Sequence, residues 1–109
     1  MDHLEIARGS TYDFTLTLSE DYDLSEATQI WITFKQSKYG KEVLTLTLND
    51  VIVEDNVISA HLTQEQTLLF LSTNEALMQV RILMTDDALV QIPPTNVIVF
   101  DVLKDGVIS

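Results

Sequence analysis

Apolar and polar residues alternate along much of the chain with a period of two. The pattern is clearest in residues 11–18, where Tyr12, Phe14, Leu16 and Leu18 are separated by Asp13, Thr15 and Thr17. Since successive side chains of a β-strand point to opposite faces, this spacing puts four large side chains on one face. The segment is therefore predicted to be a strand.

Six further segments show the same alternation or a short apolar run and are also predicted to be strands. They are residues 28–36, 42–48, 51–54, 57–62, 76–85 and 95–103. Asp55-Asn56 predicts a tight hairpin turn, because both residues tolerate left-handed backbone conformations. Asp86-Asp87 predicts the turn of another hairpin. Pro93-Pro94 cannot lie inside a paired central strand and predicts an edge or a loop.

One short helix is predicted between two strands, near residues 63–70. Thr63-Gln64-Glu65-Gln66 has the capping-box pattern, in which the Thr63 hydroxyl accepts from the Gln66 amide and the Gln66 side chain reaches back. About seven strands with frequent turns are typical of a two-sheet β-sandwich, in which this helix connects one sheet to the other. A small closed barrel is the competing architecture.

Length and composition are consistent with one folded domain over residues 1–109. The chain is 46% hydrophobic and has no cysteine, so packing and backbone pairing must hold the fold together. The apolar runs are far shorter than the ~20 residues that span a bilayer, and the first residues lack the basic start of a signal peptide. We expect a protein that stays in a cytoplasm.

The net charge of −11 bears on the choice of partner. Such a field repels phosphate backbones and anionic lipid surfaces, so neither nucleic acid nor a membrane is an expected partner. The acids cluster at residues 20–26, 50–55 and 86–87 without the spaced pattern of a calcium-binding loop. They are interpreted as solvated turn residues, and a calcium- or carbohydrate-binding module remains the alternative function.

Motifs of catalysis are missing from the sequence. His3 is expected in a mobile N-terminus and His61 on the outward side of its strand, so no zinc ligand set forms. No nucleophile elbow is present, and three glycines give no phosphate-binding loop. We therefore predict a non-enzymatic protein with no catalytic residue, no cofactor and no metal.

Several strands have apolar residues on both faces. Trp31 lies opposite in phase to Ile30, Ile32 and Phe34, where it either packs under a loop or anchors a protein interface. Leu77 and Leu83 lie opposite the apolar residues of segment 76–85, which predicts a central strand covered on both faces.

Three motifs together resemble a known group of proteins. They are R-G-S-T at residues 8–11, L-T-Q-E-Q-T-L-L-F at residues 62–70 and Q-V-R-I-L at residues 79–83. Their order resembles small proteins of about this length encoded in phages and prophages of Gram-positive bacteria, which carry R-G-[ST]-T, L-T-Q-E-[DQ]-T-L-x-F and Q-[IV]-R-[IV]-L. A more distant resemblance is to the N-terminal domain of phage baseplate upper proteins.

The resemblance covers nearly the whole chain and implies an Ig-like antiparallel β-sandwich. It implies a virion structural protein, or an accessory to virion assembly, that acts through contact with phage structural proteins or with itself. The implied location is the host bacterial cytoplasm during assembly, with the virion as an open alternative. The group transfers no catalytic or binding residues to this chain. We take Trp31, Leu77, Leu83 and the exposed strand edges as the first candidates for the interface.

Overall fold

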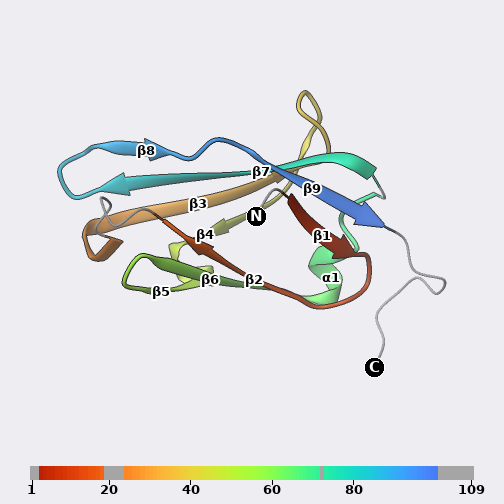
Figure 1. Ribbon diagram of the computed structural model, residues 1–109, viewed down its shortest axis with the longest axis horizontal. Helices are drawn as coiled ribbons and strands as arrows, with labels where there is room; N and C mark the ends of the chain where they lie inside the picture. The colour runs from red at the N-terminus through yellow and green to blue at the C-terminus, as the bar shows by residue number, and fades with distance from the viewer. Residues whose placement is uncertain (1–2, 19–23, 72, 101–109) are drawn as a thin grey trace.

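The computed structural model describes residues 3–18, 24–71 and 73–100, and its strands form two facing sheets (Figure 1). The elements, in chain order, are β1 (His3–Ala7), β2 (Tyr12–Thr17), the 3-10 helix η1 (Leu24–Glu26), β3 (Ala27–Lys35), β4 (Glu42–Thr47), the 3-10 helix η2 (Leu48–Asp50), β5 (Val51–Glu54), β6 (Val57–Leu62), α1 (Gln64–Thr67), β7 (Thr73–Met84), β8 (Leu89–Gln91) and β9 (Thr95–Phe100).

Strand order identifies the architecture. The large sheet runs β1-β9-β7-β3-β4, with β8 pairing β7 on the edge that β9 also uses, and the small sheet runs β2-β6-β5. The order β9-β7-β3-β4 matches strands G, F, C and C′ of an immunoglobulin-type sandwich, with β1 added beside G, and β2-β6-β5 matches strands B, E and D of the facing sheet. The prediction of an all-β sandwich is confirmed.

The seven predicted strands are all present, and two more occur. β5 and β6 have the predicted bounds, whereas β9 is described only to Phe100, so predicted strand residues 101–103 lie outside the described residues. The first additional strand, β1, starts at His3 and pairs with β9 in parallel. The segment that begins at His3 is therefore a paired strand, and its parallel pairing is an exception among the antiparallel pairs of both sheets.

Turn chemistry explains where the hairpins lie. Asp55 between β5 and β6 has φ 54° and Asp87 between β7 and β8 has φ 66°, the left-handed conformation that Asp tolerates. Pro93 and Pro94 separate β8 from β9, as predicted. Proline has no N–H to donate to a neighbouring strand, so pairing along this edge is interrupted there.

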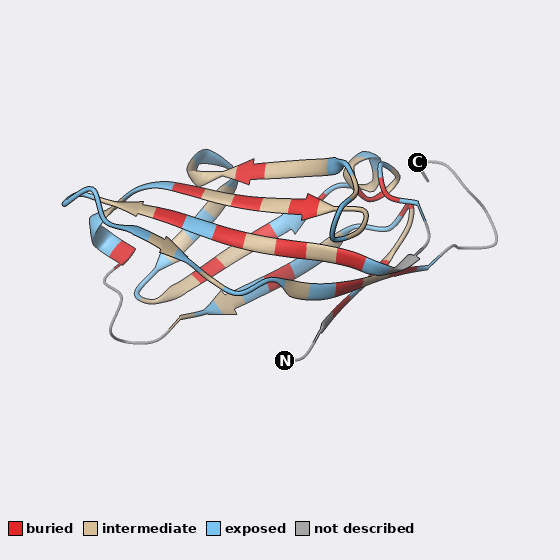
Figure 2. Cartoon of the chain, turned by 90° about the horizontal axis from the view of Figure 1, so that it is seen from above, coloured by how far each residue is buried: buried red, intermediate tan, exposed pale blue. Residues whose placement is uncertain are grey.

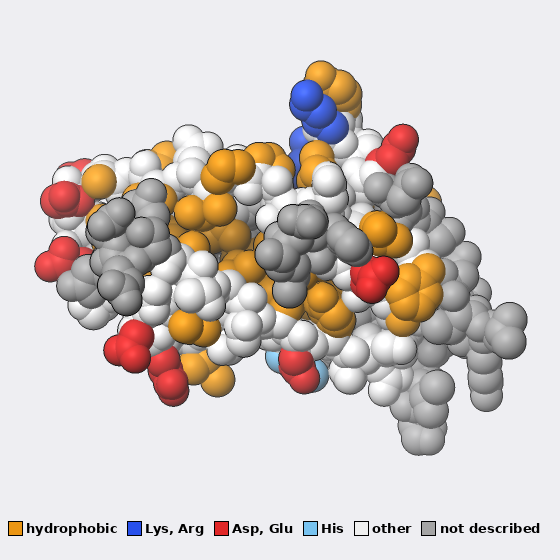
Figure 3. Space-filling model, in the orientation of Figure 1, with side chains coloured by type: hydrophobic (Ala, Val, Ile, Leu, Met, Phe, Trp, Pro, Cys, Tyr) orange, Lys and Arg blue, Asp and Glu red, His pale blue; other side chains and the backbone are white. Residues whose placement is uncertain are grey.

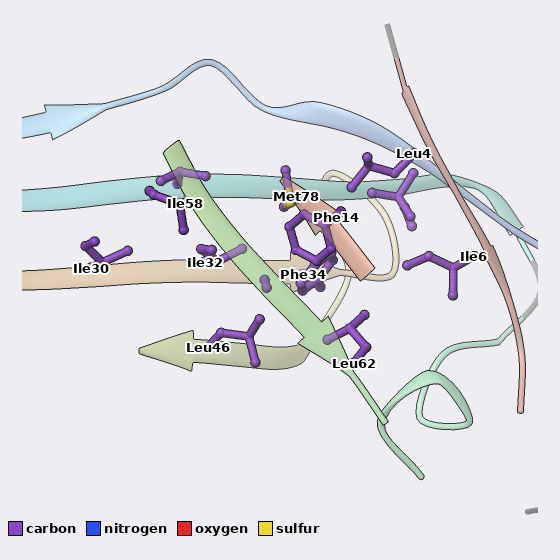
Figure 4. Packing of buried hydrophobic residues seen from close by; sticks show 14 of the residues in the cluster. Leu4, Ile6, Phe14, Ile30, Ile32, Phe34, Leu46, Ile58, Leu62 and Met78 are labelled. Carbon is purple, nitrogen blue, oxygen red and sulfur yellow. The ribbon is translucent and has the colours of Figure 1, made fainter. Parts of the chain in front are cut away.

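Alternation along the strands fills the space between the sheets. In Figure 2 buried positions alternate with more exposed ones along the long strands. Ile30, Ile32 and Phe34 of the large sheet are fully buried, and Ile58 and Leu62 face them from the small sheet (Figure 4). Phe34 lies at the centre of this core.

The two sets of alternating residues in β7 face opposite sides of the sheet, as predicted. The prediction that both of these sides are covered is not confirmed. Met78, Val80 and Ile82 are buried towards the small sheet, so Leu77 and Leu83 lie on the outer face, where both are only partly buried. β7 is central within its sheet, between β3 and β9. The small sheet covers one face of this strand, in contrast to the two covered faces expected.

Helix α1 is the predicted connection between the two sheets, but it is shorter than expected. The capping box forms as predicted, with the Gln66 amide donating to Thr63 Oγ1 (3.2 Å) and the Thr63 amide donating to Gln66 Oε1 (2.8 Å). After Thr67 the chain continues in tighter three-residue turns, which bring Phe70 into the core with no exposed surface. One helical turn therefore replaces the two to three that were expected.

Two of the sequence motifs contact each other in the fold. The Arg8 Nε donates to the Phe70 carbonyl (2.6 Å), and the Gly9 amide donates to the Thr67 hydroxyl (3.0 Å). The Thr67 hydroxyl donates in turn to the Ser10 carbonyl (2.8 Å). These bonds tie the β1–β2 turn to the segment after β6, so both motifs serve the fold.

Replacing the helix cap gives a modest loss of stability. In Thr63→Ala the Gln66 amide loses its acceptor, and we expect the free energy of unfolding to fall by about 1 kcal/mol. Urea denaturation followed by circular dichroism measures the loss, with Thr85→Ala as the exposed threonine control. An unchanged midpoint for Thr63→Ala would show that the cap does not stabilise the fold.

Candidate interaction surfaces

The outer face of the large sheet contains the three residues selected from the sequence. Trp31 lies between Arg81 of β7 and Thr47 of β4 in the sheet register. It is partly buried and lines a shallow hollow of about 460 Å³. The other lining residues, all on the same face, are Thr33, Glu42, Thr45, Arg81, Leu83 and Leu89.

The structure brings two of the three candidates together. Leu83 and Trp31 line the same hollow, whereas Leu77 pairs with Lys35 and Asn96 at the other end of β7. A contact centred on Trp31 therefore includes Leu83 but leaves Leu77 at its margin.

Leu89 is the residue of this surface that sequence reasoning missed. It lies opposite Leu83 on β8 and is 43% exposed, one of the large apolar side chains that remain accessible. The apolar run Ala88-Leu89-Val90 directly after the predicted Asp86-Asp87 turn was the available signal. A strand of three residues is too short for alternation to identify it.

Charge on the Trp31 hollow differs from that of the chain as a whole. It is lined by one carboxylate, Glu42, and one guanidinium, Arg81, whereas the chain has a net charge of −11. Glu42 Oε2 accepts from the Thr45 hydroxyl (2.6 Å), and Thr45 lies beside Thr33 in the next strand. Another acidic protein therefore meets less repulsion at this face than the net charge of the chain would produce.

The open side of the sandwich lies between β2 and the β8–β9 edge, where Figure 3 shows apolar side chains between the two sheets. A hollow of about 440 Å³ there is lined mainly by apolar and hydroxyl side chains, among them Leu16, Met78 and Ile92. Pro93 also lines it and offers no N–H to an incoming strand. Proline at this position disfavours strand addition on the β8–β9 edge.

Titratable side chains are dispersed over the described surface. The His61 ring contacts the Asp13 carboxylate on the outer face of the small sheet, as expected for an outward strand histidine. Partial burial raises the pKa of the Tyr12 phenol, and the Glu5 backbone, through a hydrogen bond, counters that rise. Among the residues the structure describes, no three His, Asp or Glu side chains form a group that could hold a metal ion.

The acid clusters separate into turn and cap residues where the structure describes them. Asp50 Oδ2 accepts from the Thr47 amide (2.9 Å) at the start of η2, and Asp86 accepts from the Ala88 amide (3.1 Å) in the β7–β8 turn. Both roles are typical of aspartate in turns. The acids at residues 20–23 lie outside the described residues.

In the described part of the chain, no helix is long and apolar enough to cross a membrane. Comparison with known proteins adds no relative: no protein-family model matches the chain, and no curated protein matches it.

Proposed function

We propose that this chain is a non-enzymatic structural or assembly protein of a phage or prophage, and that it acts through protein–protein contact. The observation that supports contact is the outer face of the large sheet, where Trp31 is kept partly exposed beside Leu83 and Leu89. Tryptophan and arginine are enriched among residues that dominate interface energies, and Arg81 lines the same hollow. Support for the phage origin comes from the three motifs at residues 8–11, 62–70 and 79–83.

The proposed mechanism is anchoring of a partner on this face. The partner is another phage structural protein or a second copy of the chain, and the net charge disfavours nucleic acid and membranes. An apolar side chain of the partner would enter the hollow between Trp31 and Leu89, while Glu42 and Arg81 pair with polar groups around it. Burial of Trp31 would provide most of the binding energy.

Gene context tests the phage role directly. We expect the flanking genes to encode capsid, portal or tail proteins, because assembly genes of a phage are grouped. Metabolic genes on both sides would contradict the proposal. The products of the flanking genes are then the partners to test.

Trp31→Thr tests the face that we assign to contact. Threonine suits a strand, so we expect a loss of roughly 1 kcal/mol in folding free energy and at least a tenfold loss of partner affinity. Calorimetric titration with the flanking gene products measures the affinity. Val57→Thr is the matched control, a partly buried apolar residue on β6 of the small sheet. Equal affinities for Trp31→Thr and the wild type would show that this face is not the interface.

A further inference from the structure

The tip of the β3–β4 hairpin is basic and aromatic, in contrast to the acidic chain that bears it. Lys35, Lys38 and Lys41 lie within seven residues that contain no Asp or Glu, and they are three of the six Lys and Arg residues in the sequence. Tyr39 is 89% exposed, and the Lys38 Nζ lies 5.4 Å from the centroid of its ring. Figure 3 shows basic and apolar side chains together on the projection that Figure 1 identifies as this hairpin.

Several contacts hold the hairpin tip in a defined shape. The Gly40 amide donates to the Ser37 carbonyl (3.1 Å), and a Cβ at Gly40 would meet Ser37 Oγ at 2.6 Å, so the turn is close-packed at this position. At its base the Gln36 side chain donates to the Leu71 carbonyl (2.8 Å) and accepts from the Leu71 amide (3.0 Å). The Tyr39 ring is thus presented on a projection that is anchored to the body of the sandwich.

The outer face of the small sheet has the opposite character. A hollow of about 480 Å³ lies over β2, β5 and β6, and Ile52, which is 65% exposed, lines it. Asp13, Asp50 and His61 also line this hollow, and none of its described lining residues is Lys or Arg. Asp50 binds the start of η2 through Oδ2 and Asp13 contacts His61, so both carboxylates are held in place on the surface.

Charge and polarity make the tip and this hollow complementary. The hollow beside Trp31 has Arg81 next to its one carboxylate, Glu42, so it offers a lysine no excess of negative charge. Among the described residues, those that line the hollow at the open side are all uncharged. The small-sheet hollow combines an apolar side chain with two carboxylates. An aromatic ring flanked by ammonium groups matches that combination.

We propose that the hairpin tip of one copy binds the small-sheet hollow of a second copy. Tyr39 packs on Ile52, and Lys38 and Lys41 lie against Asp13 and Asp50 of the neighbouring copy. Because tip and hollow are different surfaces of one chain, the contact either forms twice in a reciprocal two-fold dimer or repeats head to tail as a ring or an open filament. This inference goes beyond the proposed function, since it uses neither Trp31 nor the outer face of the large sheet.

Sedimentation velocity of the full chain over a range of concentrations tests the contact. We expect the wild type to self-associate and Tyr39→Ser to weaken association by about tenfold or more. Tyr39 is almost fully exposed, so its replacement leaves the fold intact. Lys38→Gln/Lys41→Gln should weaken association further than Gln29→Glu/Gln91→Glu, which changes the net charge equally at exposed positions of the large sheet.

A charge exchange gives the sharpest form of the test. Lys38→Glu/Lys41→Glu reverses the tip, Asp13→Lys/Thr15→Lys reverses the hollow, and each variant alone should remain monomeric. Mixing the two should restore association, because each reversed surface then meets its complement. A wild type that stays monomeric, a Tyr39→Ser variant that associates like the wild type, or a mixture that stays monomeric would each overturn the proposal. Association that is lost in Trp31→Thr and unchanged in Tyr39→Ser would also overturn it, while leaving the proposed function standing.

Discussion

Phe34→Ala is expected to lower the free energy of unfolding by about 3–5 kcal/mol, the largest effect of any single substitution considered for this fold. Phe34 has no exposed surface and lies in edge-to-face contact with Phe14 of the small sheet (centroids 6.0 Å apart) and with Phe70 after the helix (5.6 Å). Its ring thus joins both sheets and the connection between them. Removing it leaves a cavity that three separate parts of the chain would have to fill.

Urea denaturation measures this loss, and Phe34→Leu is the control that keeps an apolar side chain at the site. We expect the leucine variant to lose clearly less, because it retains most of the buried apolar volume. If Phe34→Ala were no less stable than Phe34→Leu, the ring would not fill the centre of the core. Should Phe34→Ala not fold, the leucine variant still reports the contribution of the aromatic contacts.

Thr67→Val is the second large expected effect. Valine has nearly the same shape but cannot accept from the Gly9 amide or donate to the Ser10 carbonyl, and Thr67 is fully buried. A buried amide without a partner costs about 1–3 kcal/mol, and we expect a loss of stability in that range. The β1–β2 turn should also open more often, because Thr67 ties it to the chain after β6.

Amide hydrogen exchange distinguishes this mechanism from a general loss of packing. The measured quantity is the ratio of the exchange rate of the Gly9 amide to the exchange rates of the β6 amides. We expect this ratio to be larger in Thr67→Val than in the wild type. Thr67→Ser, which keeps the hydroxyl, should protect the Gly9 amide. If the Gly9 amide also lost its protection in Thr67→Ser, loss of the methyl group would explain the faster exchange. Loss of the hydrogen bonds would then not be its cause.

Alternation in the sequence predicted most of the fold because the sandwich buries one face of each strand. β2 shows this most clearly, because its apolar residues Tyr12, Phe14 and Leu16 all lie in the core or pack against it. In β3 and β6 the apolar residues do the same, except for the outward-facing Trp31 and Val57. The sequence pattern did not predict β1, for a physical reason. Its partner β9 is some ninety residues away and pairs with it in parallel, so no hairpin turn in the nearby sequence indicates the pairing. The extent of α1 depended on distant contacts too, namely burial of Phe70 and capture of Leu71 by Gln36.

Part of each candidate surface could likewise be predicted from the sequence, and part depended on the three-dimensional structure. The outward phase of Trp31 followed from alternation, because period two assigns every residue of a strand to a face. Leu89 lies beside Trp31 and Leu77 lies apart from it. This difference results from the register of β7 with β3 and β8. The match between the hairpin tip and the small-sheet hollow needed three-dimensional structure, since Asp13, Asp50 and Ile52 come from separate segments.

Fluorescence of Trp31 tests the contact mechanism most directly, because it is the only tryptophan in the chain. The measurement is acrylamide quenching of the free protein and of its complex with a flanking gene product or with itself. We predict that quenching decreases and that the emission shifts to shorter wavelength when the complex forms, since the partner covers the face around Trp31. A complex in which quenching and emission stay as in the free protein would contradict the assignment, as would the absence of any complex.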